Sequence, residues 1–222
     1  LVDAHIHVES SMLSPTQYAL AAVRHGTIAS VSDPHEIANV LGMGGIELML
    51  NDGQRHPLKF NFGAPSCVPA TEFETAGAAL DADTVQRLLD DPRINYLSEM
   101  MNWPGVLGGD AQCLAKIHAA HQRNMPVDGH APGLTGDQAH DYIAAGIHTD
   151  HECFTYDEAI DKIEAGAKII IREGSAARNF EALHPLLESH PQRCMFGSDD
   201  RHPDDLIDKQ MDDLIRRALA HG

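Results

Sequence analysis

Residues 126–151 read PVDGHAPGLTGDQAHDYIAAGIHTDH, and this stretch holds a complete strand–helix–strand unit. Short apolar runs over 126–130 and 147–151 indicate two strands. Between them, Thr135 followed three residues later by Gln138 is a capping-box pattern, which predicts the start of a helix. Both predicted strands end on a histidine. The unit therefore predicts an α/β fold whose strand ends carry chemically active side chains.

The same alternation runs along the whole chain. Strands are predicted over residues 1–7, 27–32, 58–64, 94–99, 126–130, 147–151, 167–171 and 193–198. The last helix is predicted to begin near Pro203, with a buried face made of Ile207, Met211, Leu214, Ile215 and Ala218. Eight strands that alternate with helices predict a TIM-like (β/α)8 barrel, with residues 1–222 as one domain.

An open doubly wound sheet has the same alternation of strands and helices and is the alternative fold. Such sheets commonly carry a Gly-x-Gly-x-x-Gly turn after the first strand, and this chain has none there. They also gather ligand-binding residues at one switch point, whereas the candidate residues of this chain follow many different strands. Both observations favour the barrel.

The composition disfavours several classes of partner. Asp and Glu number 33 against 16 Lys and Arg, a formal net charge of −17, which disfavours binding to nucleic acids and anionic membranes. No apolar run approaches the roughly 20 residues of a membrane span, and the start does not resemble a signal peptide. Cys67, Cys113, Cys153 and Cys194 form no Cys-x-x-Cys pair. They predict reduced thiols in a cytoplasmic protein.

Six potential metal ligands follow the predicted strands. They are His5, His7, Glu99, His130, His151 and Asp199. Each alone is more often a structural or surface residue, but in a barrel the carboxyl ends of all strands meet at one face. Four imidazoles and two carboxylates exceed what one four-coordinate ion needs. We therefore expect two metal ions, with Glu99 as the bridging carboxylate.

Further polar residues lie at the same predicted face. Glu152 directly follows a predicted ligand and is a candidate general acid/base between water and substrate. Asp200, beside Asp199, is either a hydrogen-bond partner that supports the site or a loop-surface residue, and it is also a candidate substrate contact. His35 and His202 lie in loops after the second and eighth strands, where they could contact a substrate.

Several blocks of the chain carry a family resemblance. The blocks cover residues 3–12, 32–42, 65–71, 99–102, 104–107, 127–134, 150–153, 171–176 and 198–205. Among them, DAHIHVESSM (3–12), SDPHEIANVLG (32–42) and SDDRHPDD (198–205) are long enough to be specific. Together they resemble the adenine deaminase family of the amidohydrolase superfamily, over essentially the whole chain.

The resemblance implies a metal-dependent hydrolase barrel that converts adenine and water to hypoxanthine and ammonia through a hydroxide bridging two metal ions. It implies Mn²⁺ or Fe²⁺, with Zn²⁺ as the alternative. One ion would be held by His5, His7 and Asp199 and the other by His130 and His151, with Glu99 between them. Glu152 would carry a proton to the purine ring, and Asp199 would accept one from the hydroxide. The family's flanking small β domain and C-terminal domain are not apparent in these 222 residues.

Recognition of the purine is predicted for two short segments. Asn102 and Trp103 follow the fourth strand, and Ser66 and Cys67 follow the third. A related amidohydrolase acting on a modified aminopurine or a cyclic amide is the first alternative, because specificity resides in loops rather than in metal ligands. A non-catalytic metal-binding scaffold is the second. The sequence leaves homo-oligomer formation open.

Overall fold

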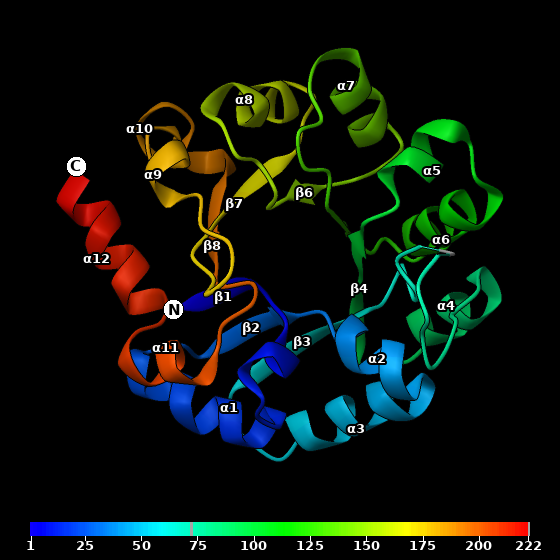
Figure 1. The fold of residues 1–222 in the computed structure, drawn as a ribbon, viewed down its shortest axis with the longest axis horizontal. Coiled ribbons are helices and arrows are strands. Elements are labelled where there is room, and N and C mark those ends of the chain that lie inside the picture. Colours follow the sequence, from blue (N-terminus) through cyan, green and yellow to red (C-terminus); the bar gives the residue numbers. More distant parts are fainter. Residues whose placement is uncertain (72, 222) are drawn as a thin grey trace.

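A computed structural model describes residues 1–71 and 73–221, and within them eight parallel strands alternate with helices around a ring (Figure 1). The strands are β1 (Val2–Ile6), β2 (Ala29–Ser32), β3 (Lys59–Ala64), β4 (Ile94–Met100), β5 (Val127–Gly129), β6 (Thr149–Asp150), β7 (Lys168–Arg172) and β8 (Cys194–Gly197). Each lies within two residues of its predicted bounds. The predicted strands are therefore confirmed.

The two sheets close into a barrel through hydrogen bonds at two places, between β1 and the residues after β8 and between β5 and the residues before β6. Strands β1 to β5 pair in sequence order, and β6 to β8 form a second sheet. Ile6 and Asp199 form a parallel bridge between β1 and the end of β8, and the Asp199 N–H donates to the His5 carbonyl at 2.9 Å. On the other side the His148 N–H donates to the Val127 carbonyl at 2.9 Å. This order confirms the (β/α)8 barrel and rules out the open sheet.

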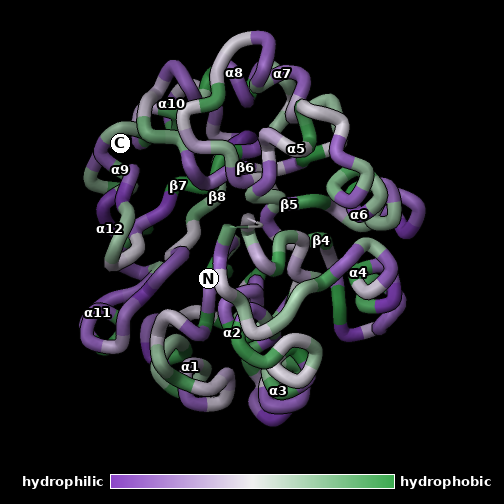
Figure 2. Tube along the Cα trace, turned by 45° about the vertical axis from the view of Figure 1, so that its right-hand side comes forward, coloured by the Kyte–Doolittle hydropathy of each residue, from purple (hydrophilic) through white to green (hydrophobic). Residues whose placement is uncertain are grey.

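Helices surround the strands. The α-helices are α1 (Pro15–Ala22), α2 (His35–Leu41), α3 (Met43–Gly53), α4 (Ala82–Leu89), α5 (Trp103–Gly108), α6 (Ala111–Gln122), α7 (Gly136–Ala144), α8 (Tyr156–Glu164), α9 (Phe180–Leu183), α10 (Leu186–Ser189), α11 (Pro203–Asp208) and α12 (Met211–His221). Short 3-10 turns cover Val8–Ser11, Val23–His25 and Pro191–Arg193. In Figure 2 hydrophobic stretches follow the strands, and hydrophilic segments lie along the outer helices. The apolar core therefore lies between strands and helices.

Helix α7 begins where the capping-box pattern predicted. Thr135 occupies its N-cap position with an extended backbone, but its side chain makes no capping hydrogen bond. At the next helix, α8, the Thr155 hydroxyl does accept from the Glu158 N–H at 3.2 Å. The pattern at Thr135 therefore located the start of α7, although the hydroxyl cap that it implies forms at Thr155 of α8 and not at Thr135.

The end of the chain differs from the prediction. Two helices, α11 and α12, replace the single helix, and the break lies at Gln210, which is fully buried. Its side chain donates to Asp3 Oδ2 at 2.8 Å and accepts from Thr27 Oγ1 at 2.6 Å. This polar anchoring ends α11 and turns Ile207 outward, where 71% of it is exposed, so its predicted burial was wrong. Met211 and Leu214 are buried as predicted, whereas Ile215 and Ala218 are half-buried.

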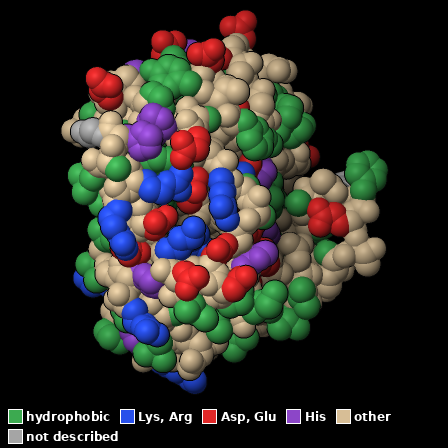
Figure 3. Space-filling view, turned by 60° about the vertical axis from the view of Figure 1, so that its left-hand side comes forward, with side chains coloured by type: hydrophobic (Ala, Val, Ile, Leu, Met, Phe, Trp, Pro, Cys, Tyr) green, Lys and Arg blue, Asp and Glu red, His purple; other side chains and the backbone are tan. Residues whose placement is uncertain are grey.

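The surface mixes both signs of charge. On the side that carries α9, α11 and α12, Lys and Arg side chains lie among Asp and Glu (Figure 3). Arg217 contacts Glu173 and Glu181 there, the latter at 2.8 Å. Within 1–71 and 73–221, no helix combines the length and the apolar character that crossing a membrane requires.

Candidate metal centre

The six predicted ligands gather at the carboxyl ends of the strands. They are His5 in β1, His7 directly after it, Glu99 in β4, His130 and His151 directly after β5 and β6, and Asp199 after β8. Five of these residues are buried, and only His130 is partly open, with 27% of its side chain exposed. The cluster is therefore a largely enclosed site that solvent reaches beside His130.

His5, His7 and Asp199 bring three ligand atoms together. The His5 and His7 Nε2 atoms lie 3.1 Å apart, and Asp199 Oδ1 lies 3.6 and 3.3 Å from them. Asp199 adopts the left-handed backbone conformation with φ of 54°, which is uncommon outside glycine and frequent at functional sites. The two histidines point the same way, because residues two apart in extended backbone project from one face.

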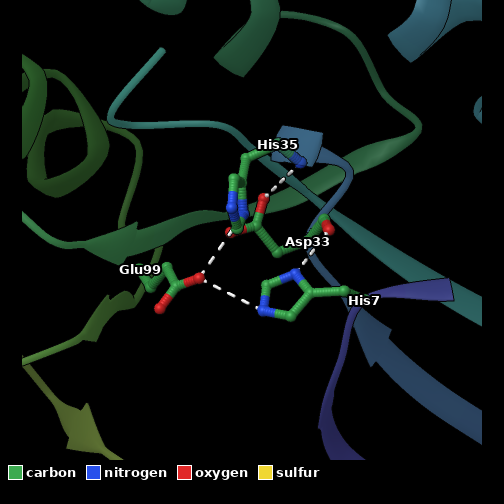
Figure 4. A group of neighbouring side chains, drawn as sticks. All are labelled: His7, Asp33, His35 and Glu99. Atoms are coloured by element: carbon green, nitrogen blue, oxygen red, sulfur yellow. Dashed lines mark hydrogen bonds and ion pairs between the residues drawn. The ribbon is translucent and has the colours of Figure 1, made fainter. Parts of the chain in front are cut away.

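Glu99 faces two different sets of histidines. Its Oε1 atom lies 3.2 Å from His7 Nε2, as Figure 4 shows. Its Oε2 atom lies 2.6 Å from His130 Nδ1 and 3.2 Å from His151 Nε2. A carboxylate that bridges two metal ions presents one oxygen to each, and Glu99 has this arrangement.

The ring orientations of the first pair suit metal binding. His5 Nδ1 lies 2.7 Å from Asp128 Oδ2, and His7 Nδ1 lies 3.1 Å from the Asp33 carbonyl. A proton on Nδ1 satisfies both contacts and leaves the Nε2 lone pair facing the cluster. Protein metal ligands commonly hold their imidazoles in this way.

His151 gives the clearest test of fit to a metal ion. Its ring is buried and stacks on that of His5 with centroids 3.8 Å apart. Among the described residues neither of its nitrogens makes a well-aligned hydrogen bond, although Nε2 faces the carboxylates of Glu99 and Glu152 at 3.2 and 3.5 Å. Buried polar atoms without partners are costly and rare. An ion beside Nε2 would satisfy one of them, so the residues present fit a metal site.

The charges of the cluster depend on one another. Burial alone would raise the pKa of Glu99, but His130, His151 and His7 hold it well below its usual value. Burial alone would lower the pKa of His5, but Asp128 and Asp199 hold it well above. The carboxylates therefore keep their negative charge, and divalent cations bound there would balance that charge in place of the protons on the histidines.

Glu152 lies beside the second pair of histidines. Its Oε1 atom is 3.5 Å from both His130 Nδ1 and His151 Nε2. Arg172, at the end of β7, holds Glu152 in a two-pronged contact and also contacts Asp199. Arg172 is not among the site residues predicted from the sequence, although its position directly after the predicted strand 167–171 was a usable signal.

The Amidohydrolase family model matches residues 1–221 of the chain. The chain belongs to the amidohydrolase family. Its sequence is 61% identical to a protein named adenine deaminase from Salinibacter ruber and 58% identical to one from a Sulfurovum species. Both alignments cover the whole chain, which spans 41% and 42% of the relatives' lengths.

Among solved structures, the amidohydrolase chain resembles N-isopropylammelide isopropylaminohydrolase from Burkholderia multivorans. The TM-score is 0.60, with 14% sequence identity over 99% of this chain and 71% of the other. At this identity the likeness concerns the fold, and it agrees with the barrel described above.

Two predicted substrate contacts of the amidohydrolase chain lie beside Glu99. His35 Nδ1 is 3.4 Å from Glu99 Oε1 and 3.1 Å from Asp33 Oδ2, so His35 forms the edge of the cluster in Figure 4. Ser66 is buried, and its hydroxyl donates to the Glu99 carbonyl at 2.5 Å. Both residues remain candidates for substrate contact. His35 borders the cluster, and Ser66 is hydrogen-bonded to the backbone of β4 at Glu99.

The other candidates are engaged in local structure. Cys67 is buried with its sulfur 3.8 Å from Met100 Sδ. The Asn102 side chain caps α5 by accepting from the Gly105 N–H at 2.9 Å, and Trp103 is half-buried against the core.

Two candidate substrate contacts, Asp200 and His202, lie in the loop after β8, and only Asp200 is close to the cluster. Asp200 is half-buried and accepts from the Ser10 hydroxyl at 2.6 Å, close to the cluster. His202 is exposed at the start of α11, where its backbone N–H donates to Ser175 Oγ at 2.9 Å. Among the described residues the His202 side chain makes no hydrogen bond to the cluster.

Proposed function

We propose that this chain is the catalytic barrel of a hydrolase that deaminates adenine to hypoxanthine and ammonia. The observation that carries the proposal is the position of Glu99 between two sets of histidines, with Glu152 beside one set. The names of the relatives support adenine as the substrate, and the acidic chain suits a small neutral purine as partner.

Two divalent ions fit the cluster, and Mn²⁺ or Fe²⁺ is the choice we propose, with Zn²⁺ as the alternative. One would be held by His5, His7 and Asp199, and the other by His130 and His151, with Glu99 shared. Bound there, such ions would act as Lewis acids and make a nucleophilic water available near neutral pH.

The remaining steps belong to the side chains. Asp199 accepts a proton from the water that adds to C6 of adenine, and Glu152 delivers a proton to ring N1, which keeps the ring from becoming anionic. Asp199 then gives its proton to the amino group, the C6–N6 bond breaks and ammonia leaves. The C6 hydroxyl loses its proton to Glu152 as the carbonyl of hypoxanthine forms, which restores both side chains. Arg172 contacts both Glu152 and Asp199, so it holds the two proton-carrying groups in one orientation.

The test measures the product formed from each of a panel of substrates by liquid chromatography, because N6-methyladenine would release methylamine and a cyclic amide would open its ring without releasing ammonia. The protein is expressed together with any flanking segments that its gene encodes and is loaded with Mn²⁺ or Fe²⁺. Adenine, N6-methyladenine, 2,6-diaminopurine and a cyclic amide are compared. We expect the highest kcat/KM for adenine, with hypoxanthine as product. Preference for another substrate would support the alternative amidohydrolase activity, and turnover of none would favour the metal-binding scaffold.

A further inference from the structure

A buried lysine that no step proposed above uses lies beside the two loops that carry His130 and His151. Lys162 on α8 is 0% exposed, and its ammonium donates to the Ala131 carbonyl at 2.6 Å. It also lies 3.0 Å from Glu158 Oε1 and 3.2 Å from Asp150 Oδ2, both of which are buried. Burying three charges is costly even when they are paired, so a well-packed apolar set would commonly serve stability as well.

These three side chains, which we call the buried clamp, join two loops. Ala131 directly follows His130, and Asp150 directly precedes His151. Asp150 Oδ2 accepts from the Ala131 N–H at 3.1 Å, and its Oδ1 accepts from the Glu152 N–H at 2.7 Å. One carboxylate thus connects the backbones beside two proposed ligands and the proposed proton carrier.

Glu158 and Lys162 strengthen the same connection. Glu158 Oε1 accepts from the Gly133 N–H at 2.8 Å, and its Oε2 accepts from the Phe154 N–H at 2.9 Å. Lys162 binds both carboxylates and the Ala131 carbonyl, so it stands at the centre of the network. Burial alone would lower the pKa of Lys162, but Asp150 and Glu158 hold it above its usual value.

The other proposed ion position is built differently. His5 lies within β1, Asp199 is attached to it through the bridge between β1 and β8, and Asp128 holds the His5 ring. The buried clamp makes no hydrogen bond to any of these three residues in the described chain. The two positions share Glu99, and His151 stacks on the His5 ring, so breaking the clamp should disturb the position of His130 and His151 more strongly than the other.

We propose that the buried clamp is a positioning device that sets the separation of His130 and His151, so that the affinity of the ion they would hold depends on Lys162. The inference rests on the proposed metal centre. It adds that the two ion positions are unequal, and that their difference originates in a residue that contacts no ligand side chain directly.

The test replaces Lys162 with methionine, which is similar in length and uncharged. The matched control is Lys116→Met. Lys116 is also a buried lysine, but it donates to the Ser66 and Leu80 carbonyls at 2.7 and 2.8 Å, away from both ligand loops. The protein, with any flanking segments that its gene encodes, is loaded with Mn²⁺ and dialysed against a graded chelator. Bound manganese is counted by elemental analysis, and electron paramagnetic resonance detects coupling between paired ions.

We expect the parent protein and Lys116→Met to retain two coupled ions. In Lys162→Met one ion should remain, uncoupled, and the affinity for the second should fall by about 10- to 100-fold, the usual effect of removing support from a ligand. Circular dichroism checks the fold. If Lys162→Met does not fold, Lys162→Met/Glu158→Gln replaces it, because it removes one of the two buried negative charges that lose their counter-charge.

A folded variant that keeps both ions with unchanged affinity would overturn the inference. Equal loss of both ions would overturn it too, since the clamp would then lack selectivity. A parent protein that binds no pair of ions would instead refute the proposed metal centre, and this inference with it. The results thus distinguish failure of the clamp from failure of the site.

Discussion

At the scale of single residues, Glu99 connects the two halves of the candidate site. Its two oxygens contact different histidines, and its backbone carbonyl accepts from Ser66. Few substitutions preserve this role, because a shorter side chain cannot reach both sets and a neutral one cannot balance two cations. The metal content of Glu99 variants therefore reports directly on the bridge.

Glu99→Ala should lose one or both ions, because neither position keeps its shared carboxylate. Elemental analysis of protein loaded with Mn²⁺ measures the loss. Glu164→Ala, an exposed glutamate on α8, is the control and should keep the parent metal content. Unchanged stoichiometry in Glu99→Ala would remove Glu99 from the bridge.

Glu152→Gln should keep its metal and lose activity. Glutamine has the same shape and can still accept from Arg172, but it cannot carry a proton. We expect kcat for adenine to fall by about 10²- to 10⁴-fold, the usual contribution of a general acid/base. Steady-state kinetics, together with metal analysis of the same sample, checks this. A rate near that of the parent would contradict the proton-carrying role.

The positions of the six proposed ligands could be predicted because they lie at or directly after the ends of five strands, and parallel strands bring their carboxyl ends together. The residues that hold these ligands in place, Arg172 and Asp128, could not be predicted. Arg172 contacts Glu152 and Asp199, which lie 20 and 27 residues away in the sequence. Asp128 contacts His5 across 123 residues. Such partners depend on side-chain directions inside the closed barrel, which sequence spacing does not specify.

At the scale of elements, the strands were predictable and the last helix was not. Apolar runs between helix signals located every strand to within two residues. The break between α11 and α12 depends instead on Gln210, a polar side chain whose partners Asp3 and Thr27 lie at the other end of the chain. Helical periodicity contains no information about such a distant anchor, which explains the wrong prediction for Ile207.

Helix α12 should contribute to stability through its buried face. Leu214 is fully buried in the cluster with Phe180 and Leu183, so Leu214→Ala should lower the free energy of unfolding by about 2–5 kcal/mol. Leu219→Ala on the same helix is the control, because 75% of Leu219 is exposed, and its effect should stay within about 0.5 kcal/mol. Urea unfolding followed by circular dichroism compares the two variants, and equal effects would contradict the packing described.

At the scale of the whole molecule, the barrel encloses its thiols as well as its site. All four cysteines are free, and only Cys194 is more than slightly exposed. Burial raises the pKa of Cys113 to about 12 and that of Cys194 to about 11. Since the thiolate is the reactive form, native thiols should react slowly at pH 8.

Ellman's reagent tests this property of the whole barrel. At pH 8 the native chain should show slow reaction, led by Cys194, whereas the chain unfolded in guanidinium should react quickly at all four thiols. Cys194→Ser should remove the earliest native phase, because the other three thiols are buried. Fast reaction of several thiols in the native protein would show that the barrel is more open than described.

The central claim is that one face of the barrel holds two metal ions between His5, His7 and Asp199 on one side and His130 and His151 on the other. Anomalous diffraction from crystals of the manganese-loaded protein tests it most directly. The account predicts two peaks about 3.5–4 Å apart, with the Glu99 carboxylate between them. A single peak, or a pair held by other residues, would contradict it.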